Sequence, residues 1–219
     1  LDSSGPAGML RVYLAGAFLT ALCCALWKGF LLAWCKAAVP GFSLRHYFRE
    51  YWSRIYPMLW ATASESLAAP LNLYLVKKHY PQIWPEVRRF VVGVGAFLDI
   101  NGTMICTIVL TTVVAGLLGI PLSWAQLALC VPLVFLIGFG VPGIPGELLL
   151  FALPLVQLLD LSGPASGAFL GIFLGLQLGL PDSFRTGTNS TDSCPLALLL
   201  NKIYARRHAG DKRPDDTEI

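Results

Sequence analysis

The sequence predicts an all-α integral membrane protein in which a re-entrant helical hairpin followed by a broken transmembrane helix occurs twice, as an inverted repeat. Three observations predict this fold. The 219-residue chain has a mean hydropathy of +0.64, and charged residues make up 13% of it, against about 25% in a soluble domain. Short apolar arms around polar or Gly/Pro-rich tips alternate with long apolar stretches that polar residues interrupt. No Lys or Arg occurs between Arg89 and Arg185.

The positions of the basic residues indicate how the chain is oriented in the membrane. The formal net charge of +3 is too small to indicate a nucleic-acid partner. Lys and Arg gather in three clusters, and the positive-inside rule assigns all three to the cytoplasmic side. We therefore expect a multi-pass protein of the cell membrane with a cytoplasmic C-terminus. The clusters are Arg45, Arg49 and Arg54; Lys77, Lys78, Arg88 and Arg89; and Lys202, Arg206, Arg207, Lys212 and Arg213.

Composition divides the chain into a polar leader at residues 1–8, a transmembrane domain at 9–208 and a charged cytoplasmic tail at 209–219. The domain starts with an apolar helix at 10–39, in which Arg11, Lys28 and Lys36 are long enough to snorkel toward the membrane interfaces. The segments that follow are a hairpin at 44–78, a broken helix at 87–119, a second hairpin at 125–160 and a second broken helix at 165–207.

Both hairpins are expected to enter the bilayer and return to the side from which they came. A helix needs about 20 residues to cross a hydrocarbon core of about 30 Å, and each hairpin arm is too short for that. The first hairpin turns at the polar tip Ser64-Glu65-Ser66, and the second turns in the Gly/Pro-rich run 138–146. Basic residues flank only the first, so the two should enter from opposite faces. Inverted repeats with interrupted helices are typical of secondary transporters.

The two broken helices carry the polar residues that we expect at membrane depth. In the first, Asp99-Ile-Asn-Gly-Thr103 predicts an unwound turn that lines a cavity. In the second, Asp182, Arg185 and Asn189 stand at i, i+3 and i+7 and share one helix face, which Asp192 continues. Charged groups inside a bilayer cost about 3 kcal/mol or more unless they face one another, an ion or a ligand. The stripe therefore predicts a binding site rather than a lone structural ion pair.

Four motifs resemble those of the dicarboxylate/amino acid:cation symporter family, which includes the glutamate transporters. They occur in the family's order and spacing, and the resemblance covers most of the transmembrane domain. It implies the C-terminal, transport-domain half of a glutamate transporter homologue. The motifs are Ser64-Glu-Ser66 for a serine run, Asp99-Ile-Asn-Gly-Thr103 for N-M-D-G-T with acid and amide exchanged, Phe139-Gly-Val-Pro-Gly143 for A-G-V-P-G, and Asp182, Arg185, Thr186 and Asn189 for D-x-x-R-T-x-x-N.

The resemblance implies a sodium-coupled symporter that moves acidic amino acids or dicarboxylates by an elevator-type mechanism. Arg185 would bind the side-chain carboxylate of the substrate and Asp182 its ammonium group, while Asn189 and Thr103 would hold its α-carboxylate. Sodium prefers oxygen ligands because it is a hard cation. The other implied substrate contacts are Thr186, Ser64, Ser66, Gly140, Val141 and Gly143, and the implied sodium ligands are Gly95, Asp99, Asn101, Asn189 and Asp192.

The partners implied by the resemblance are the lipid bilayer, a small-molecule substrate and Na⁺ as the coupling ion. The family's earlier helices form a trimerisation scaffold, against which the transport domain moves. This chain has only the last helix before the first hairpin, the two hairpins and the two broken helices. We therefore expect a homotrimer where the N-terminal scaffold is present.

Three acidic residues depart from the family pattern or add to it. The family's last aspartate follows the asparagine by four residues, whereas Asp192 follows Asn189 by three, so either Asp192 or Ser193 takes that corner. Glu65 adds a carboxylate to the first hairpin tip. It either repels an anionic substrate, pairs with the buried arginine or points to the cytoplasmic water. Glu147 is interpreted as an acid at a helix N-terminus.

Other functions compete with acidic-substrate symport. One is a non-transporting or truncated homologue that acts as a binding or sensor relic, and another is a symporter for neutral amino acids. A membrane hydrolase that uses Ser64 or Ser66 is disfavoured, because all three histidines lie in interfacial or tail segments. We therefore expect a protein that is not an enzyme. The histidines are His46, His79 and His208.

Overall fold

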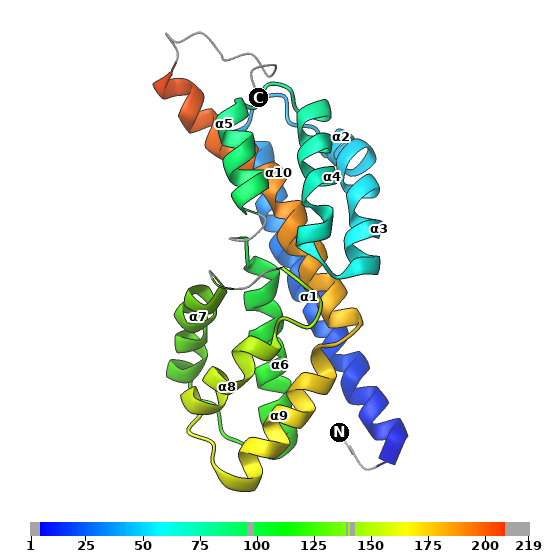
Figure 1. Ribbon diagram of the computed structural model, residues 1–219, viewed down its shortest axis with the longest axis vertical. Helices are drawn as coiled ribbons and strands as arrows, with labels where there is room; N and C mark the ends of the chain where they lie inside the picture. The colour runs from blue at the N-terminus through cyan, green and yellow to red at the C-terminus, as the bar shows by residue number, and fades with distance from the viewer. Residues whose placement is uncertain (1–4, 96–98, 139, 141–142, 209–219) are drawn as a thin grey trace.

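The computed structural model describes residues 5–95, 99–138, 140 and 143–208, and this part of the chain is helical without a β-strand. The molecule is elongated, and the long helices α1 (Gly5–Ala38) and α10 (Leu180–Arg207) run side by side through its middle (Figure 1). The other elements are α2 (Leu44–His46), the π-helical segment η1 (Tyr47–Trp52), α3 (Ser53–Thr62), α4 (Glu65–His79), α5 (Pro85–Arg88), the π-helical segment η2 (Arg89–Val94), α6 (Asn101–Leu118), α7 (Trp124–Gly138), α8 (Leu149–Leu158) and α9 (Gly163–Gln177).

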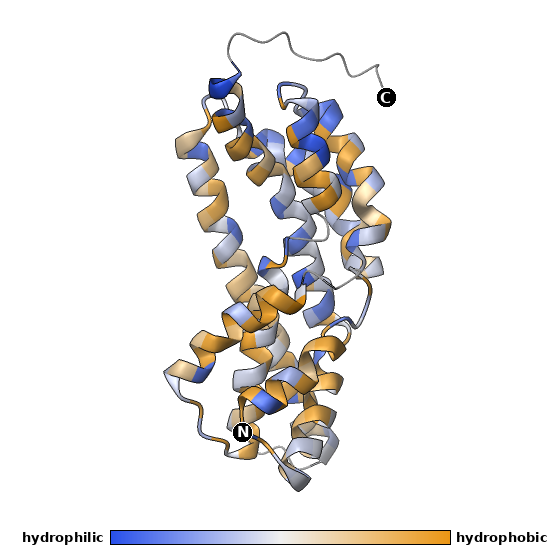
Figure 2. Ribbon diagram, turned by 60° about the vertical axis from the view of Figure 1, so that its left-hand side comes forward, coloured by the Kyte–Doolittle hydropathy of each residue, from blue (hydrophilic) through white to orange (hydrophobic). Residues whose placement is uncertain are grey.

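The described helices have the length and composition of a membrane protein. Two of them, α1 and α6, are long and apolar enough to cross a bilayer, and α9 with α10 forms a third candidate span that is bent by 65°. Apolar residues cover much of the flanks, and hydrophilic residues concentrate at the end that carries the C-terminus (Figure 2). The all-helical, membrane-embedded class expected from the sequence agrees with these elements. The re-entrant path of the hairpins stays a prediction.

Two pairs of short helices stand at the positions of the expected hairpins. Ala63 turns the chain between α3 and α4 with a left-handed backbone (φ 46°), and the Ser64 hydroxyl then caps α4 by accepting from the Leu67 N–H at 3.3 Å. The second pair, α7 and α8, lies at the opposite end of the molecule (Figure 1). The arms contain 10 or 15 residues, which is about 15 to 22 Å at 1.5 Å per residue.

The first broken helix is interrupted slightly earlier than the sequence predicts. We expected an unwound turn from Asp99 to Thr103, but α6 already begins at Asn101. The reason is that the Asn189 side-chain oxygen accepts from the backbone N–H groups of Gly102 (2.6 Å) and Thr103 (3.3 Å). These N–H groups of a first helical turn have no partner within their own helix. A side chain of α10 therefore stabilises the start of α6.

The second broken helix bends at Leu178 and Gly179, just before the polar stripe. Gly179 has a φ of 76°, which favours glycine. The Tyr13 hydroxyl bridges the break, since it donates to the Leu178 carbonyl and accepts from the Leu180 N–H, both at 2.9 Å. The whole polar stripe is consequently part of the continuous helix α10.

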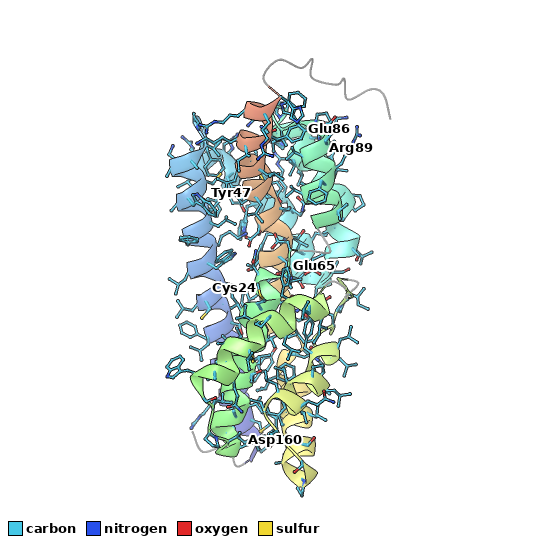
Figure 3. All side chains as sticks on the ribbon, turned by 90° about the vertical axis from the view of Figure 1, so that its left-hand side faces the viewer. Cys24, Tyr47, Glu65, Glu86, Arg89 and Asp160 are labelled. Atoms are coloured by element: carbon cyan, nitrogen blue, oxygen red, sulfur yellow. The ribbon has the colours of Figure 1, made fainter. Side chains whose placement is uncertain are left out.

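Two apolar cores lie on either side of the polar centre. One joins the first hairpin to α1, η2 and the end of α10, around Tyr47, Tyr51 and Ile55. The other joins the second hairpin to α6 and α9, around Phe151 and Phe173. Among the labelled side chains of Figure 3, Glu65 lies near mid-height, whereas Glu86, Arg89 and Asp160 lie at the two ends. The buried polar residues of α10, from Asp182 to Ser193, thus lie between the two apolar cores.

Candidate functional site

The polar stripe of α10 is buried, although it consists of charged and hydroxyl side chains. Arg185, Thr186 and Asp192 are inaccessible to solvent, and Asp182 and Asn189 are each 2% exposed. The helices α1, α3, α4 and α6 and the segment η2 pack against α10. A buried polar group needs a partner because its contact with water is lost. The partners of these five residues therefore define what the site can bind.

Arg185 is surrounded by three carboxyl groups from three different elements. Its guanidinium donates to Asp182 of the same helix (Nε to Oδ1, 2.7 Å) and to Glu147, which precedes α8. The guanidinium Nη1 also donates to the Thr103 hydroxyl at 3.1 Å and lies 3.9 Å from Glu65 Oε1. One guanidinium thus faces three carboxylates, which leaves an excess of two negative charges when all four groups are ionised.

The structure decides between the readings of Glu65 and adds a contact of Glu147. Glu65 is 2% exposed, and the Asn189 amide donates to its Oε1 at 3.0 Å. Of the three readings of Glu65, the water-facing one is therefore wrong, and the residue faces Arg185. Glu147 does lie just before α8, but its carboxylate binds Arg185. The interpretation of Glu147 as a helix N-terminal acid did not include this contact. The two residues are 38 positions apart in the sequence, so no local pattern connects them.

The tips of the two hairpins touch above Arg185. The Ser64 hydroxyl donates to the Gly143 carbonyl at 3.0 Å, and the Ser66 N–H donates to the same oxygen at 3.4 Å. Gly146 of the second tip donates its N–H to Asp182 at 2.9 Å. Because the tips and their acidic residues cover Arg185, the site is closed to solvent in this structure.

Two other expected contacts of the second tip do not take part in this enclosure. Gly140 is exposed, and its N–H donates to the Ile137 carbonyl of its own arm. Val141 lies outside the described residues. The sequence motif around these positions thus contributes Gly143 and Gly146 to the site as described.

Several buried polar atoms around Arg185 have no hydrogen-bond partner in the described part of the chain. They include Glu65 Oε2, Glu147 Oε2 and the Thr186 hydroxyl oxygen. Buried polar atoms in native proteins are paired in the large majority of cases. Two of the three atoms are carboxylate oxygens, which only accept hydrogen bonds when ionised. Arg185 Nη2, a donor, also has no hydrogen-bond partner among the described residues. The closed site therefore offers unpaired acceptors at the two glutamates and an unpaired donor at Arg185, which a polar ligand could satisfy.

Thr103 and Asn189 connect the site to α6. The Thr103 hydroxyl accepts from Arg185 and from the Asn189 amide, at 3.1 and 2.9 Å. A β-carbon at Gly102 would collide with the backbone of Arg185, so α6 and α10 approach each other closely at this glycine. The Asn189 oxygen already caps α6, so this side-chain oxygen is not free for an ion.

Three of the expected sodium ligands lie together beside the break before α6. Asn101 donates its amide to Asp99 Oδ1 at 2.6 Å, while Asp99 Oδ2 is buried and has no partner among the described residues. The Gly95 carbonyl accepts from the Asp99 N–H at 2.7 Å. Gly95, Asp99 and Asn101 also line a cavity of about 340 Å³. An unpaired carboxylate oxygen beside a cavity and a carbonyl fits a hard cation such as sodium.

Asp192 has partners that the sequence analysis missed. The Lys28 ammonium forms an ion pair with its Oδ1, and the Trp27 indole donates to its Oδ2 at 2.6 Å. The expectation that Lys28 snorkels to an interface is therefore wrong, since its side chain is only 12% exposed. Both residues are on α1, and their separation from Asp192 by about 165 positions hides the contact from local sequence patterns. Ser193, the other candidate for this corner, instead bonds to Ser190 and Asn72.

Comparison with known proteins gives the family. A comparison with curated proteins finds no significant match. The model of the sodium:dicarboxylate symporter family, however, matches residues 3–203, which is nearly the whole chain and includes both hairpins and both broken helices. This is a family of membrane transporters rather than of enzymes, and sodium-coupled symport is implied by it. The chain therefore belongs to the sodium:dicarboxylate symporter family, as its four motifs predict.

Proposed function

We propose that this chain is the transport domain of a sodium-coupled symporter and that its substrate binds against Arg185, beneath the touching hairpin tips. The observation that carries the proposal is the group of unpaired buried atoms there, Glu65 Oε2, Glu147 Oε2 and the Thr186 hydroxyl. Buried polar atoms without a partner in a closed, charged site require an explanation, and a site that binds a polar ligand supplies one. Asp182, Thr103 and Asn189 hold Arg185 and its neighbours in place.

The charges of the site favour a substrate with an ammonium group and at most one carboxylate. Glu65 and Glu147 need donors, and an α-ammonium group supplies three N–H groups. A second carboxylate would meet Asp182, Glu65 and Glu147 around the single guanidinium of Arg185. Two like charges 4 Å apart repel by about 4 kcal/mol at an effective dielectric constant of about 20. We therefore propose an amino acid with a neutral or basic side chain.

A second candidate is an acidic amino acid or a dicarboxylate, and the position of Arg185 favours it. Arg185 occupies the arginine of the D-x-x-R-T-x-x-N motif, and guanidinium groups bind carboxylates bidentately. For such a substrate to reach Arg185, its carboxylate has to displace Glu147. The two candidates therefore differ in what Glu147 does, and substitution of this residue separates them.

Competition binding to the purified protein tests the two candidates. Binding of radiolabelled L-alanine and L-lysine is measured in the presence of sodium, with L-aspartate and succinate as competitors. We expect alanine or lysine to bind and aspartate to compete poorly. Glu147→Gln should strengthen aspartate binding at least tenfold, because it removes one negative charge at Arg185 and a tenfold change corresponds to about 1.4 kcal/mol.

The matched control is Glu50→Gln, which neutralises an exposed acid of η1 that pairs with Arg54, away from Arg185. It should leave every affinity unchanged. Aspartate binding to the unmodified protein that is stronger than the binding of alanine and lysine would support the acidic candidate. If none of the four compounds binds in sodium, the symporter proposal itself is wrong and a non-transporting relic becomes the better account.

The coupling ion, the movement and the assembly complete the proposal. Gly95, Asp99 and Asn101 are the residues that would hold sodium.

The basic clusters support a cytoplasmic C-terminus, since α2, α5 and the end of α10 lie at one end of the molecule (Figure 1). Elevator-type movement and a homotrimer are carried by the family resemblance alone. Labelling of single cysteines at positions 122 and 212 in intact cells tests the orientation, with labelling at 122 only as the expected result.

A further inference from the structure

Lys28 lies near the middle of α1, and all three N–H donors of its ammonium group are used by α10. The ammonium group pairs with Asp192 Oδ1, donates to the Thr191 hydroxyl at 2.8 Å and donates to the Thr188 carbonyl at 3.4 Å. An ammonium group has three donors and no acceptor. A lysine that is 12% exposed and fully bonded to one helix is a fixed part of the site.

The second oxygen of Asp192 also faces donors only. Trp27 Nε1 donates to Oδ2 at 2.6 Å, and Asn101 Nδ2 donates to it at 3.2 Å. Sodium would need oxygen lone pairs directed at it, whereas the groups directed at Asp192 are N–H groups. Asp192 was an expected sodium ligand, and its surroundings do not fit that ion.

We propose that the Lys28 ammonium group is a built-in cation, which takes the place of a coupling sodium ion at Asp192. Both carry one positive charge, but the ammonium group is covalently attached to α1 and does not exchange with the solution. The contact with Asp192 is therefore complete without an ion. This inference rests on the proposed sodium-coupled function, because only there does it matter which residues bind the coupling ion.

Asp99 provides the contrast within the same region. Its Oδ2 is buried without a partner in the described part of the chain, and Asp99 lines a cavity together with Gly95 and Asn101. The carboxylate at Asp99 therefore has a place for a free cation, whereas the carboxylate at Asp192 has its cation already. Sodium should accordingly bind at Asp99 without Asp192 as a ligand, because Lys28 occupies that carboxylate.

The test is the sodium dependence of thermal unfolding of the purified protein, with choline chloride keeping the ionic strength constant. An ion that binds only the folded state raises the folding equilibrium constant by up to tenfold for each tenfold increase in its concentration. For the unmodified protein we expect this response of one bound ion, which we call the one-ion response. Lys28→Met frees Asp192 as a sodium ligand beside Asp99, so its response to sodium should be larger than that of the unmodified protein and begin at a lower sodium concentration. Lys28→Met combined with Asp192→Asn should return to the one-ion response.

Two single substitutions keep the test decisive if Lys28→Met does not fold. Lys28→Arg retains the cation and should keep the one-ion response. Asp192→Asn should also keep it, because Asp192 binds no sodium. A weaker sodium response in Asp192→Asn would overturn the inference, and so would equal responses of Lys28→Met and the unmodified protein.

The two proposals fail in different ways. If sodium leaves the unfolding temperature of the unmodified protein unchanged but raises that of Lys28→Met, sodium coupling is refuted and the built-in cation is supported. Insensitivity of both proteins to sodium would overturn both proposals. A sodium response that Asp99→Asn abolishes, together with an unchanged response in Asp192→Asn, would support both.

Discussion

The two charged clusters on α10 are about 10 Å apart along the helix, since Arg185 and Asp192 are separated by seven residues, yet they are built in different ways. At Arg185, one guanidinium faces three carboxyl groups, and buried oxygens lack partners. At Asp192, one ammonium group faces one carboxylate, and both carboxylate oxygens have donors. The first cluster is unbalanced in charge and in hydrogen bonds, whereas Asp192 in the second has a partner at each of its oxygens.

The elements that supply the partners explain the difference. Glu65 and Glu147 come from the two hairpin tips, which contact each other through Ser64, Ser66 and Gly143. Trp27 and Lys28 come from the interior of α1, which packs along α10 over much of its length. Side chains at a hairpin tip move when the tip moves, whereas side chains inside a long packed helix keep their positions. The Arg185 cluster is therefore suited to exchange a ligand and the Asp192 cluster to remain closed.

Arg185→Ala should have the largest effect on stability. It leaves Asp182, Glu65 and Glu147 buried without their cation, and loss of one partner of a buried ion pair costs about 3–5 kcal/mol. Denaturant titration in detergent micelles measures the loss. Combining Arg185→Met with Glu147→Gln should recover part of it, because fewer uncompensated charges remain buried.

Lys28→Met is the matched change at the other cluster, and its cost should be smaller. Asp192 keeps the Trp27 and Asn101 donors after this substitution, so we expect about 1–3 kcal/mol, the cost of an incompletely satisfied buried group. A loss at Lys28 that equals or exceeds the loss at Arg185 would contradict the proposed difference between the clusters.

The sequence predicts the parts of this molecule that depend on local patterns. The hydropathy and the interrupted apolar segments predict the helical membrane fold, and the spacing of Asp182, Arg185 and Asn189 predicts their common face. All three are buried on one helix in the structure. Periodicity predicts such a face because i, i+3 and i+7 positions coincide on a helix whatever the tertiary structure is.

The missed contacts are those that depend on packing between distant elements. Lys28 in an apolar run has the pattern of a snorkelling residue, and only the packing of α1 on α10 brings it to Asp192. Tyr13 bridges the break at Leu178 for the same reason. The pairing of Glu147 could have been predicted from the sequence. An acid that directly follows a Gly/Pro-rich tip at membrane depth needs a cation, and Arg185 is the cation of the polar stripe.

Gly143→Ala should have an intermediate effect, on the cover of the Arg185 cluster. Gly143 has a φ of 65°, and a β-carbon there would lie 3.3 Å from Glu65 and from the Ser66 hydroxyl. The left-handed conformation costs a residue with a β-carbon about 1–2 kcal/mol. We expect the tips to separate more often, which hydrogen exchange at Ser66 would detect as reduced protection.

Gly171→Ala controls for the gain of a methyl group. Gly171 lies inside α9, and nothing stands within 4 Å of its added β-carbon. Alanine is about 0.8–1.0 kcal/mol more favourable than glycine inside a helix, so this variant should be neutral or stabilising. Equal protection at Ser66 in the two variants would show that the backbone of Gly143 does not hold the tips together.

The smallest expected effect is the energetic coupling between the clusters, and a double-mutant cycle of Glu147→Gln and Lys28→Met measures it. Their hydrogen bonds run through different residues, Thr103 and Asn189 on one side and Trp27 and Thr191 on the other. Changes at sites without shared partners add to within about 0.5 kcal/mol. We therefore expect the double variant to lose the sum of the two single losses within that margin. A coupling above about 1 kcal/mol would mean that Asn101 and Thr103, neighbours in the first turn of α6, transmit the charge state of one cluster to the other. The lysine would then influence the substrate site directly, and the two clusters would have to be treated as one.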